Sequence, residues 1–191
     1  MKPARKVNPG LSLLLAAAVG CASGGGHKYH DVNMDFGSVK TVAVLPFQNL
    51  SRESSAGERV RDVFSNMLLA TGSIYVLPQG EVMRGLARVN VQNFTAPSVE
   101  EVTKLGGLLK VDAVITGVVK EYGEVRSGSS SANIVSVSVD MLEAQTGRVV
   151  WSASSTKGGI GLGDRMFGGG GGPINDVTEQ AVDDLINKLF K

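Results

Sequence analysis

The chain has few of the residues that catalysis and metal binding most often use. Its 191 residues include one cysteine and two histidines, His27 and His30. A single cysteine excludes an intramolecular disulfide and a cysteine-rich zinc site. Beyond residue 40 neither residue type occurs, which removes the usual general base, the usual thiol nucleophile and most sets of metal ligands. We therefore expect no catalytic residues, no metal and no cofactor.

An excess of charge of one sign is also absent. The chain has 19 basic and 18 acidic residues, so it has no cationic surface field for a phosphate backbone, and we expect no nucleic acid partner. Nine of the fifteen residues in the range 158–172 are glycine. Their spacing matches neither the dinucleotide-binding nor the P-loop pattern, so we expect no nucleotide either.

No hydrophobic run is long enough to cross a membrane. The apolar run Leu11–Val19 has nine residues and follows Lys2, Arg5 and Lys6. As a helix it would span about 14 Å, which is half of a hydrocarbon core of roughly 30 Å. A charged start followed by a short apolar run is typical of a secretory signal, and we assign residues 1–20 to it.

The cysteine follows this signal directly. Residues 18–21, Ala-Val-Gly-Cys, resemble the lipobox of bacterial lipoproteins. The resemblance implies cleavage before Cys21, lipidation of Cys21 and, because Ala22 is not aspartate, delivery to the outer membrane. The alternative is ordinary secretion with a free thiol. Residues 21–39 contain Gly24–Gly26 and both histidines but no apolar periodicity, so we interpret them as a flexible tether, not as a metal site.

The patterns beyond residue 40 predict one α/β (α+β) domain over residues 40–191. It has a mixed sheet of about five strands, with amphipathic helices packed on the sheet and a C-terminal helix. Caps are expected at Ser55, with Glu58 completing a capping box, at Ser98 with Glu101, and at Asn175. The alternation in 133–142 predicts a strand with one wet face, and Thr146-Gly147 predicts a hairpin turn toward a buried Trp151. Strands are expected at 41–47, 73–77, 112–122, 133–142 and 149–153, and helices at 55–72, 81–88, 97–109 and 175–189.

Two clusters could be read as sites. Asp164, Arg165, Met166 and Phe167 lie between glycines in the 158–172 loop. Met166 and Phe167 could contact a partner protein or a membrane, or could fold back to cover the edge of the core. The serines of 129–131 near Glu124 could be imagined as a catalytic cluster, but a solvated hairpin tip explains them more simply.

Several motifs resemble the curli-secretion (CsgG) and LpoB-like superfamily of bacterial envelope lipoproteins, which shares the fold of the TolB N-terminal domain. They are Val-Ala-Val-Leu-Pro-Phe at 42–47, Asp-Ala-Val-Ile-Thr-Gly at 112–117, Glu-Tyr-Gly at 121–123 and Ala-Gln-Thr-Gly-Arg-Val-Val-Trp at 144–151. The resemblance implies a periplasmic α/β domain tethered to the outer membrane. It also implies association with envelope proteins or with further copies of the chain.

The export channel of that superfamily forms its pore from two inserted hairpins, and each membrane strand needs about 9–11 residues. Here only eight residues separate Val125 from Ile134 and thirteen separate Ile160 from Ile174, so we expect no pore. The prediction is a non-catalytic, outer-membrane-anchored periplasmic lipoprotein that acts as a binding or assembly module. The alternatives are an LpoB-type activator of a penicillin-binding protein and an accessory component of an export or transport system.

Overall fold

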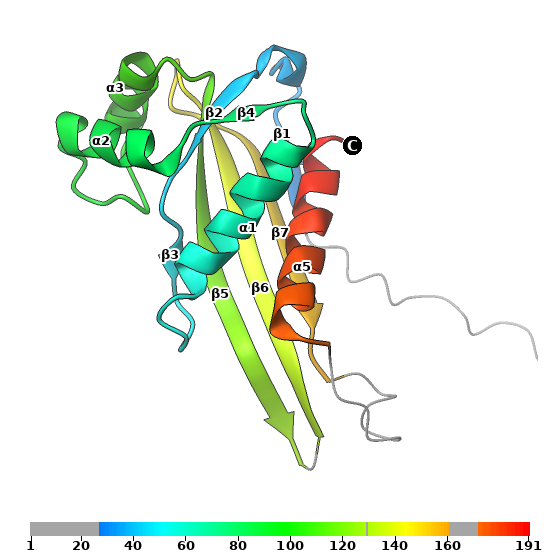
Figure 1. Cartoon of the computed structure of the whole chain (residues 1–191). Helices are drawn as coiled ribbons and strands as arrows, with labels where there is room; N and C mark the ends of the chain where they lie inside the picture. Colours follow the sequence, from blue (N-terminus) through cyan, green and yellow to red (C-terminus); the bar gives the residue numbers. More distant parts are fainter. Residues whose placement is uncertain (1–26, 129, 161–171) are drawn as a thin grey trace, which may run out of the picture.

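The computed structural model describes residues 27–128, 130–160 and 172–191. The signal, Cys21 and the cluster Asp164–Phe167 lie outside these ranges. Figure 1 shows the arrangement of the elements. The strands are β1 (Lys28–His30), β2 (Thr41–Val44), β3 (Gln48–Asn49), β4 (Tyr75–Val76), β5 (Ala113–Ser127), β6 (Ser130–Glu143) and β7 (Val149–Gly158), and the helices are η1 (Phe36–Ser38, a 3-10 turn), α1 (Ala56–Ala70), α2 (Gln79–Val89), α3 (Val99–Leu109) and α5 (Ile174–Leu189).

The strands form one mixed sheet of the kind that the sequence predicts. Its order is β1-β7-β6-β5-β2-β4, and β3 pairs with β5 beyond the end of β2. The pairs β2–β4, β2–β5 and β3–β5 are parallel, whereas β5, β6, β7 and β1 follow one another antiparallel. The single α/β domain with a C-terminal helix is confirmed. The sheet has seven strands where about five were expected, because the two-residue and three-residue strands leave little pattern in the sequence.

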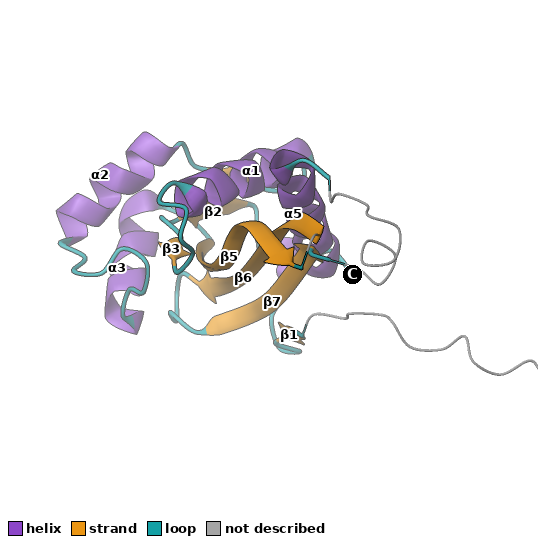
Figure 2. Ribbon diagram, turned by 90° about the horizontal axis from the view of Figure 1, so that it is seen from below, coloured by secondary structure: helices purple, strands orange, loops and turns teal. Residues whose placement is uncertain are grey.

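Helices cover both faces of the sheet. Helices α1 and α5 pack over β5, β6 and β7, with Phe64, Leu185 and Trp151 among the fully buried side chains of this layer. Helices α2 and α3 bury Leu86 and Leu105 against the opposite face of β2 and β5. Figure 2 shows α1 and α5 together over the long strands and α2 and α3 grouped to one side. The chain thus changes face at β4, between α1 and α2.

Alternation along β6 and β7 follows the prediction. Val135, Val137, Val139 and Met141 are buried, and the serines between them are half-buried. Trp151 is only 1 % exposed, as expected for a core residue. Val149 is exposed, because the register shifts between Met141 and Leu142 and moves this end of β7 off the alternating pattern.

Two of the three expected caps are wrong. Ser98 forms the predicted capping box with Glu101 at the start of α3. Ser55 makes no cap bond to α1, because its hydroxyl donates to the Glu53 carboxylate at 2.9 Å. Helix α5 begins at Ile174 after Pro173, whose φ of −53° already suits a helix start, so Asn175 lies inside the first turn.

Part of the expected tether belongs to the sheet. Strand β1 pairs antiparallel with β7, from Lys28 opposite Ala153 to His30 opposite Trp151. The His30 Nε2 lies 3.3 Å from the Lys188 carbonyl oxygen, and its ring centroid lies 4.6 Å from that of Phe36. The sheet therefore includes residues 28–30, which lie within the segment expected as a tether. Backbone pairing, not an apolar pattern, holds this segment.

Candidate functional site

The residues singled out from the sequence are largely beyond the described part of the chain. Cys21 and Asp164, Arg165, Met166 and Phe167 are not placed, so both interpretations of Met166 and Phe167 remain predictions. The described flanks of the glycine-rich segment meet at Asn133 in β6. The Gly159 N–H donates to the Asn133 carbonyl oxygen at 2.8 Å, and the Asn133 Nδ2 donates to the Gly172 carbonyl oxygen at 3.0 Å.

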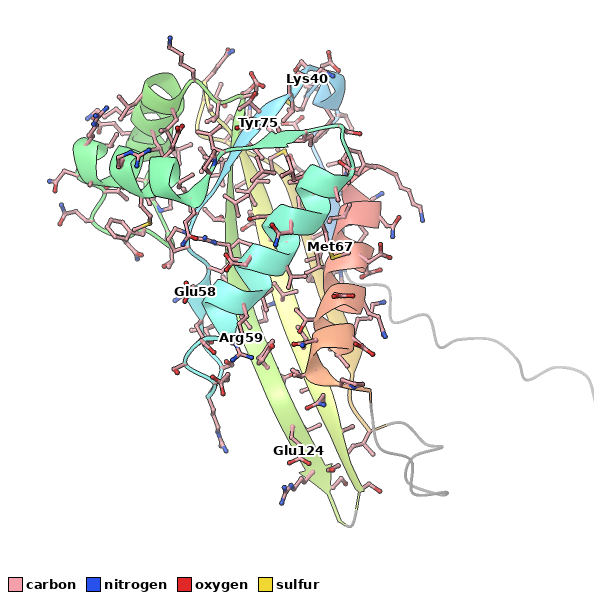
Figure 3. The ribbon with its side chains drawn as sticks, viewed as in Figure 1. Lys40, Glu58, Arg59, Met67, Tyr75 and Glu124 are labelled. Carbon is pink, nitrogen blue, oxygen red and sulfur yellow. The ribbon has the colours of Figure 1, made fainter. Side chains whose placement is uncertain are left out.

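The cluster around Glu124 lies at the outer end of the β5–β6 hairpin (Figure 3). Arg126 donates to Glu124 Oε2 through Nε at 3.0 Å and through Nη2 at 2.8 Å. Hydrogen bonds from Ser131 and then from Arg126 hold the pKa of the Glu124 carboxyl below its ordinary value. A carboxyl that stays ionised among exposed side chains is a poor general base. The described residues of this cluster therefore lie at the solvated tip of a hairpin, as expected.

A groove runs between α1 and the edge strand β4, where the sequence indicated no site. It encloses about 420 Å³, and we call it the β4 groove. One wall is a flank of α1, and the opposite wall is β4 and the residues that follow it. The lining residues are Val44, Arg61, Asp62, Ser65, Asn66, Leu69, Tyr75, Val76, Leu77, Pro78 and Gln79.

Arg61 is the buried charge of this groove. The residue is only 4 % exposed, and it lies on the side of α1 that also buries Val60 and Phe64. Its Nη2 is 3.1 Å from Oδ1 of Asp62, whose side chain is about half exposed. Its Nε has no hydrogen-bond partner among the residues that the structure describes. Leaving a buried donor unpaired costs about 1–3 kcal/mol, so the guanidinium is only partly satisfied within the chain.

The groove lies at the carboxyl ends of two parallel strands. Val44 is the last residue of β2, and Leu77 directly follows β4. Helix α2 begins there at Gln79 without a side-chain cap, so its positive end is open toward the groove. Crevices at the carboxyl ends of strands, where the chain changes face, are the usual ligand sites of open α/β sheets. Together with Arg61, this arrangement suits an anionic group.

One long side of the groove is an unpaired backbone edge. The Tyr75 N–H donates to the Lys40 carbonyl oxygen and the Leu77 N–H to the Val42 carbonyl oxygen, so both face β2. Strand geometry then turns the N–H and C=O of Val76 the other way, and β4 has no second partner strand in the described chain. Leu69 and Tyr75 border this edge and are 46 % and 55 % exposed. Figure 3 marks Tyr75 on β4.

The sequence pattern could have pointed to part of this groove. Asp62, Ser65, Asn66 and Leu69 are spaced as one flank of a helix, which marks a surface stripe. Arg61 gives no such signal, because an arginine beside the apolar face of a helix is normally solvated. Its place in the groove becomes visible only in the folded chain, where β4 and the residues after it form the opposite wall.

No helix in ranges 27–128, 130–160 and 172–191 is long and apolar enough to cross a membrane. Over the same residues, no group of three or more histidine, cysteine, aspartate or glutamate side chains is placed to hold a metal ion.

One family model matches this chain. It is the GNA1162-like model, described as "Putative lipoprotein GNA1162-like", and it matches residues 33–189. Among curated proteins the comparison finds no significant match. The match starts within the segment expected as a tether and covers the whole sheet beyond β1, including both walls of the β4 groove.

Solved structures with similar folds include three kinds of protein. The PelC dodecamer from Paraburkholderia phytofirmans is 17 % identical with a TM-score of 0.58, covering 86 % of this chain and 98 % of that one. The lipoprotein GNA1162 from Neisseria meningitidis is 19 % identical with a TM-score of 0.56, covering 79 % and 98 %. The LpoB C-terminal domain from Salmonella enterica is 11 % identical with a TM-score of 0.50, covering 66 % and 86 %.

These likenesses show the fold. They support the lipoprotein and LpoB-like part of the resemblance drawn from the sequence motifs. They do not support the curli-secretion (CsgG) label, which we correct accordingly. Motifs such as Val-Ala-Val-Leu-Pro-Phe form the strands and turns of the sheet, so they carry information on the fold more than on the family.

Proposed function

Because the chain belongs to the GNA1162-like family, we propose that it is a lipid-anchored, non-catalytic envelope protein that acts as a binding and assembly module. The anchor is Cys21, and the location is the periplasmic face of the outer membrane. The lipoprotein description of the family supports the anchor, and Ala22 after the cysteine supports the outer membrane.

The observation that carries the binding role is the β4 groove. It combines an unpaired strand edge, a buried arginine and two exposed apolar side chains on its rim. Binding sites commonly combine an apolar contact area with a few well-placed polar groups. The dodecameric state of PelC, which shares the fold, supports self-association of this chain as one form of assembly.

The position of β1 bears on the alternative of a synthase activator. Strand β1 begins seven residues after Cys21, so the segment before it reaches at most about 25 Å when fully extended. An outer-membrane lipoprotein that activates an inner-membrane enzyme needs a long reach across the periplasm. The short segment therefore favours a binding module that works close to its own membrane. The same short segment would restrict an accessory role in transport to the outer membrane.

Membrane fractionation of cells that produce the full chain tests this proposal. The wild-type protein should be in the outer-membrane fraction, with a mature N-terminal peptide that carries acyl groups on Cys21 in mass spectrometry. Cys21→Ser should be released from membranes. Ala22→Asp is the matched variant, because it keeps the cysteine and should shift the protein to the inner-membrane fraction. An unmodified Cys21 in the mature wild-type protein would exclude the anchor.

A further inference from the structure

We propose that the β4 groove binds an extended, acidic segment of a partner polypeptide. The segment adds to the open edge of β4 as a further strand and places a carboxylate side chain on Arg61. This inference rests on the proposed binding role and specifies the site and the chemistry of the partner.

The backbone of β4 provides the main contact. Tyr75 and Leu77 use their N–H groups on β2, which leaves the N–H and C=O of Val76 facing outward. An incoming strand can pair with these groups, as in other proteins that bind peptides by adding a strand to a sheet edge. The α1 flank formed by Asp62, Ser65, Asn66 and Leu69 lines the other side of the groove and would contact the added strand.

Charge determines which segment fits. Among the residues that the structure describes, the buried Arg61 has one ion pair, with the half-exposed Asp62, and its Nε has no hydrogen-bond partner. A buried charge is stabilised only when its hydrogen-bonding groups are satisfied. A carboxylate fits the planar guanidinium and can accept hydrogen bonds from two of its N–H groups. The uncapped start of α2 at Gln79 adds positive potential at the same end of the groove.

The rim provides an apolar contact. Leu69 comes from α1 and Tyr75 from β4, on the two sides of the groove, and both are about half exposed. Tyrosine and arginine are the residue types that most often dominate binding energy at interfaces. Alternate residues of an added strand point to the same face, so an acidic residue directed at Arg61 would have apolar neighbours two positions away.

Arg61 could instead serve only the stability of the fold, and the two roles predict opposite results for Arg61→Met. If the buried charge of Arg61 serves binding, replacing it with an apolar side chain of similar length should leave the protein equally stable or more stable. A purely structural arginine would lose stability on the same change.

The test selects ligands from a displayed library of random nine-residue peptides. The target is the full mature chain in dodecylmaltoside micelles. We expect enriched peptides with aspartate or glutamate at one fixed position and with β-branched or aromatic residues two positions away. For the best peptide, changing that acidic residue to its amide should weaken binding at least tenfold. Free acetate at the same concentration should not compete.

Matched variants then locate the site. Arg61→Met should bind the acidic peptide and its amide counterpart equally weakly while its Tm is equal to or above that of the wild type. Arg59→Met changes an exposed arginine of the same helix (Figure 3) and should leave both affinities unchanged. Backbone amide signals of residues 62–69 and 75–79 should shift on titration with the selected peptide.

Three results would overturn the inference: enriched peptides without a fixed carboxylate, a lower Tm of Arg61→Met with binding retained, or no enrichment at all. A fourth result would also reject the inference. If no peptide is enriched and the full chain forms oligomers that disappear in Arg61→Met, the groove binds a second copy of the chain. The membrane fractionation of Cys21→Ser does not depend on Arg61. Failure of the anchor and failure of the groove are therefore distinguishable.

Discussion

Gly117 and Phe47 form a contact that leaves no room for a side chain. Gly117 lies in β5 opposite Val139, and a Cβ placed on it would be 2.8 Å from three atoms of the Phe47 ring. We expect Gly117→Ala to lower the free energy of unfolding by about 1–3 kcal/mol, because the buried ring must move. Urea unfolding measures this loss. Gly107→Ala is the control: Gly107 is exposed in α3 with open space around its Cα, so this change should be neutral or stabilising.

Asp184 makes the stability dependent on pH. Its Oδ2 accepts from Lys188 Nζ at 2.6 Å and its Oδ1 lies 3.7 Å from Lys157 Nζ, while Lys188 Nζ also donates to the Ser154 carbonyl oxygen. Partial burial alone would raise the pKa of Asp184, but hydrogen bonding, from Lys188 first and then from Ser155, together with the charges of Lys188 and Lys157, outweighs it, so the pKa lies below its ordinary value. A lowered pKa stabilises the fold above the ordinary value of about 3.9, and this stability is lost as the pH falls through the folded-state pKa.

We therefore expect Asp184→Asn to cost about 1 kcal/mol at pH 7, and the difference from the wild type to vanish near pH 2. Urea unfolding at a series of pH values measures it. Asp183→Asn is the control, because Asp183 is an exposed neighbour that accepts only from Asn187. A difference between wild type and Asp184→Asn that persists unchanged to pH 2 would contradict this account.

Residue-scale predictions succeed where the local sequence decides the contact. Ser98 and Glu101 exchange side-chain-to-backbone hydrogen bonds within one helical turn, so the capping box can be predicted from the sequence alone. Ser55 fails because Glu53, outside the pattern, competes for its hydroxyl. Arg61 could not be found at all, since the groove that it lines is formed together with β4 and the start of α2, which follow it in the chain.

At the scale of elements, the β5–β6 hairpin extends beyond the helices that cover the sheet (Figure 1). The four residues Arg126, Ser127, Ser130 and Ser131 near its tip are exposed or half-buried. Removing all four shortens each strand by two residues, which keeps every side chain on its face and retains the two-residue turn. We expect the Tm to change by no more than about 2 °C, because only surface contacts are lost.

A deletion of Val125, Arg126, Ser127 alone is the contrasting variant. It leaves residues 130–132 of β6 without their partners on β5, or shifts β5 by an odd number of residues against β6, and should lower the Tm by clearly more than the paired deletion. Thermal unfolding followed by circular dichroism compares the two. Equal Tm values for both deletions would show that the outer hairpin contributes nothing through its register.

Elements with a long apolar pattern could be predicted, and among the short strands only β4 was expected, at 73–77, whereas β1 and β3 were missed. Helices α1 and α5 and strands β5 to β7 have buried residues at the spacing of their secondary structure. Strand β1 has only three residues, and its pairing with β7 depends on backbone bonds between segments far apart in the sequence. The β4 groove depends on the same kind of information, because it exists only where the sheet ends.

For the whole molecule, the position of β1 sets how close the sheet can lie to the proposed anchor at Cys21. A random coil of seven residues, the separation between Cys21 and Lys28, would extend on average about 15 Å, against about 25 Å for a coil of the 19 residues first assigned to the tether. Trp151 lies opposite His30 at this end and is the only tryptophan in the chain. Its emission therefore reports the distance from the domain to the membrane without any label on the protein.

We expect energy transfer from Trp151 to a dansyl-labelled lipid headgroup when the full mature chain is reconstituted into vesicles. Inserting a segment of twelve glycine and serine residues after Gly26 should reduce the transfer, because it raises the average extension of a coil from about 15 Å to about 25 Å. Cys21→Ser, which removes the proposed anchor, should abolish it. Equal transfer with and without the insertion would mean that another surface of the domain holds it at the membrane, and the short segment would then not set its position.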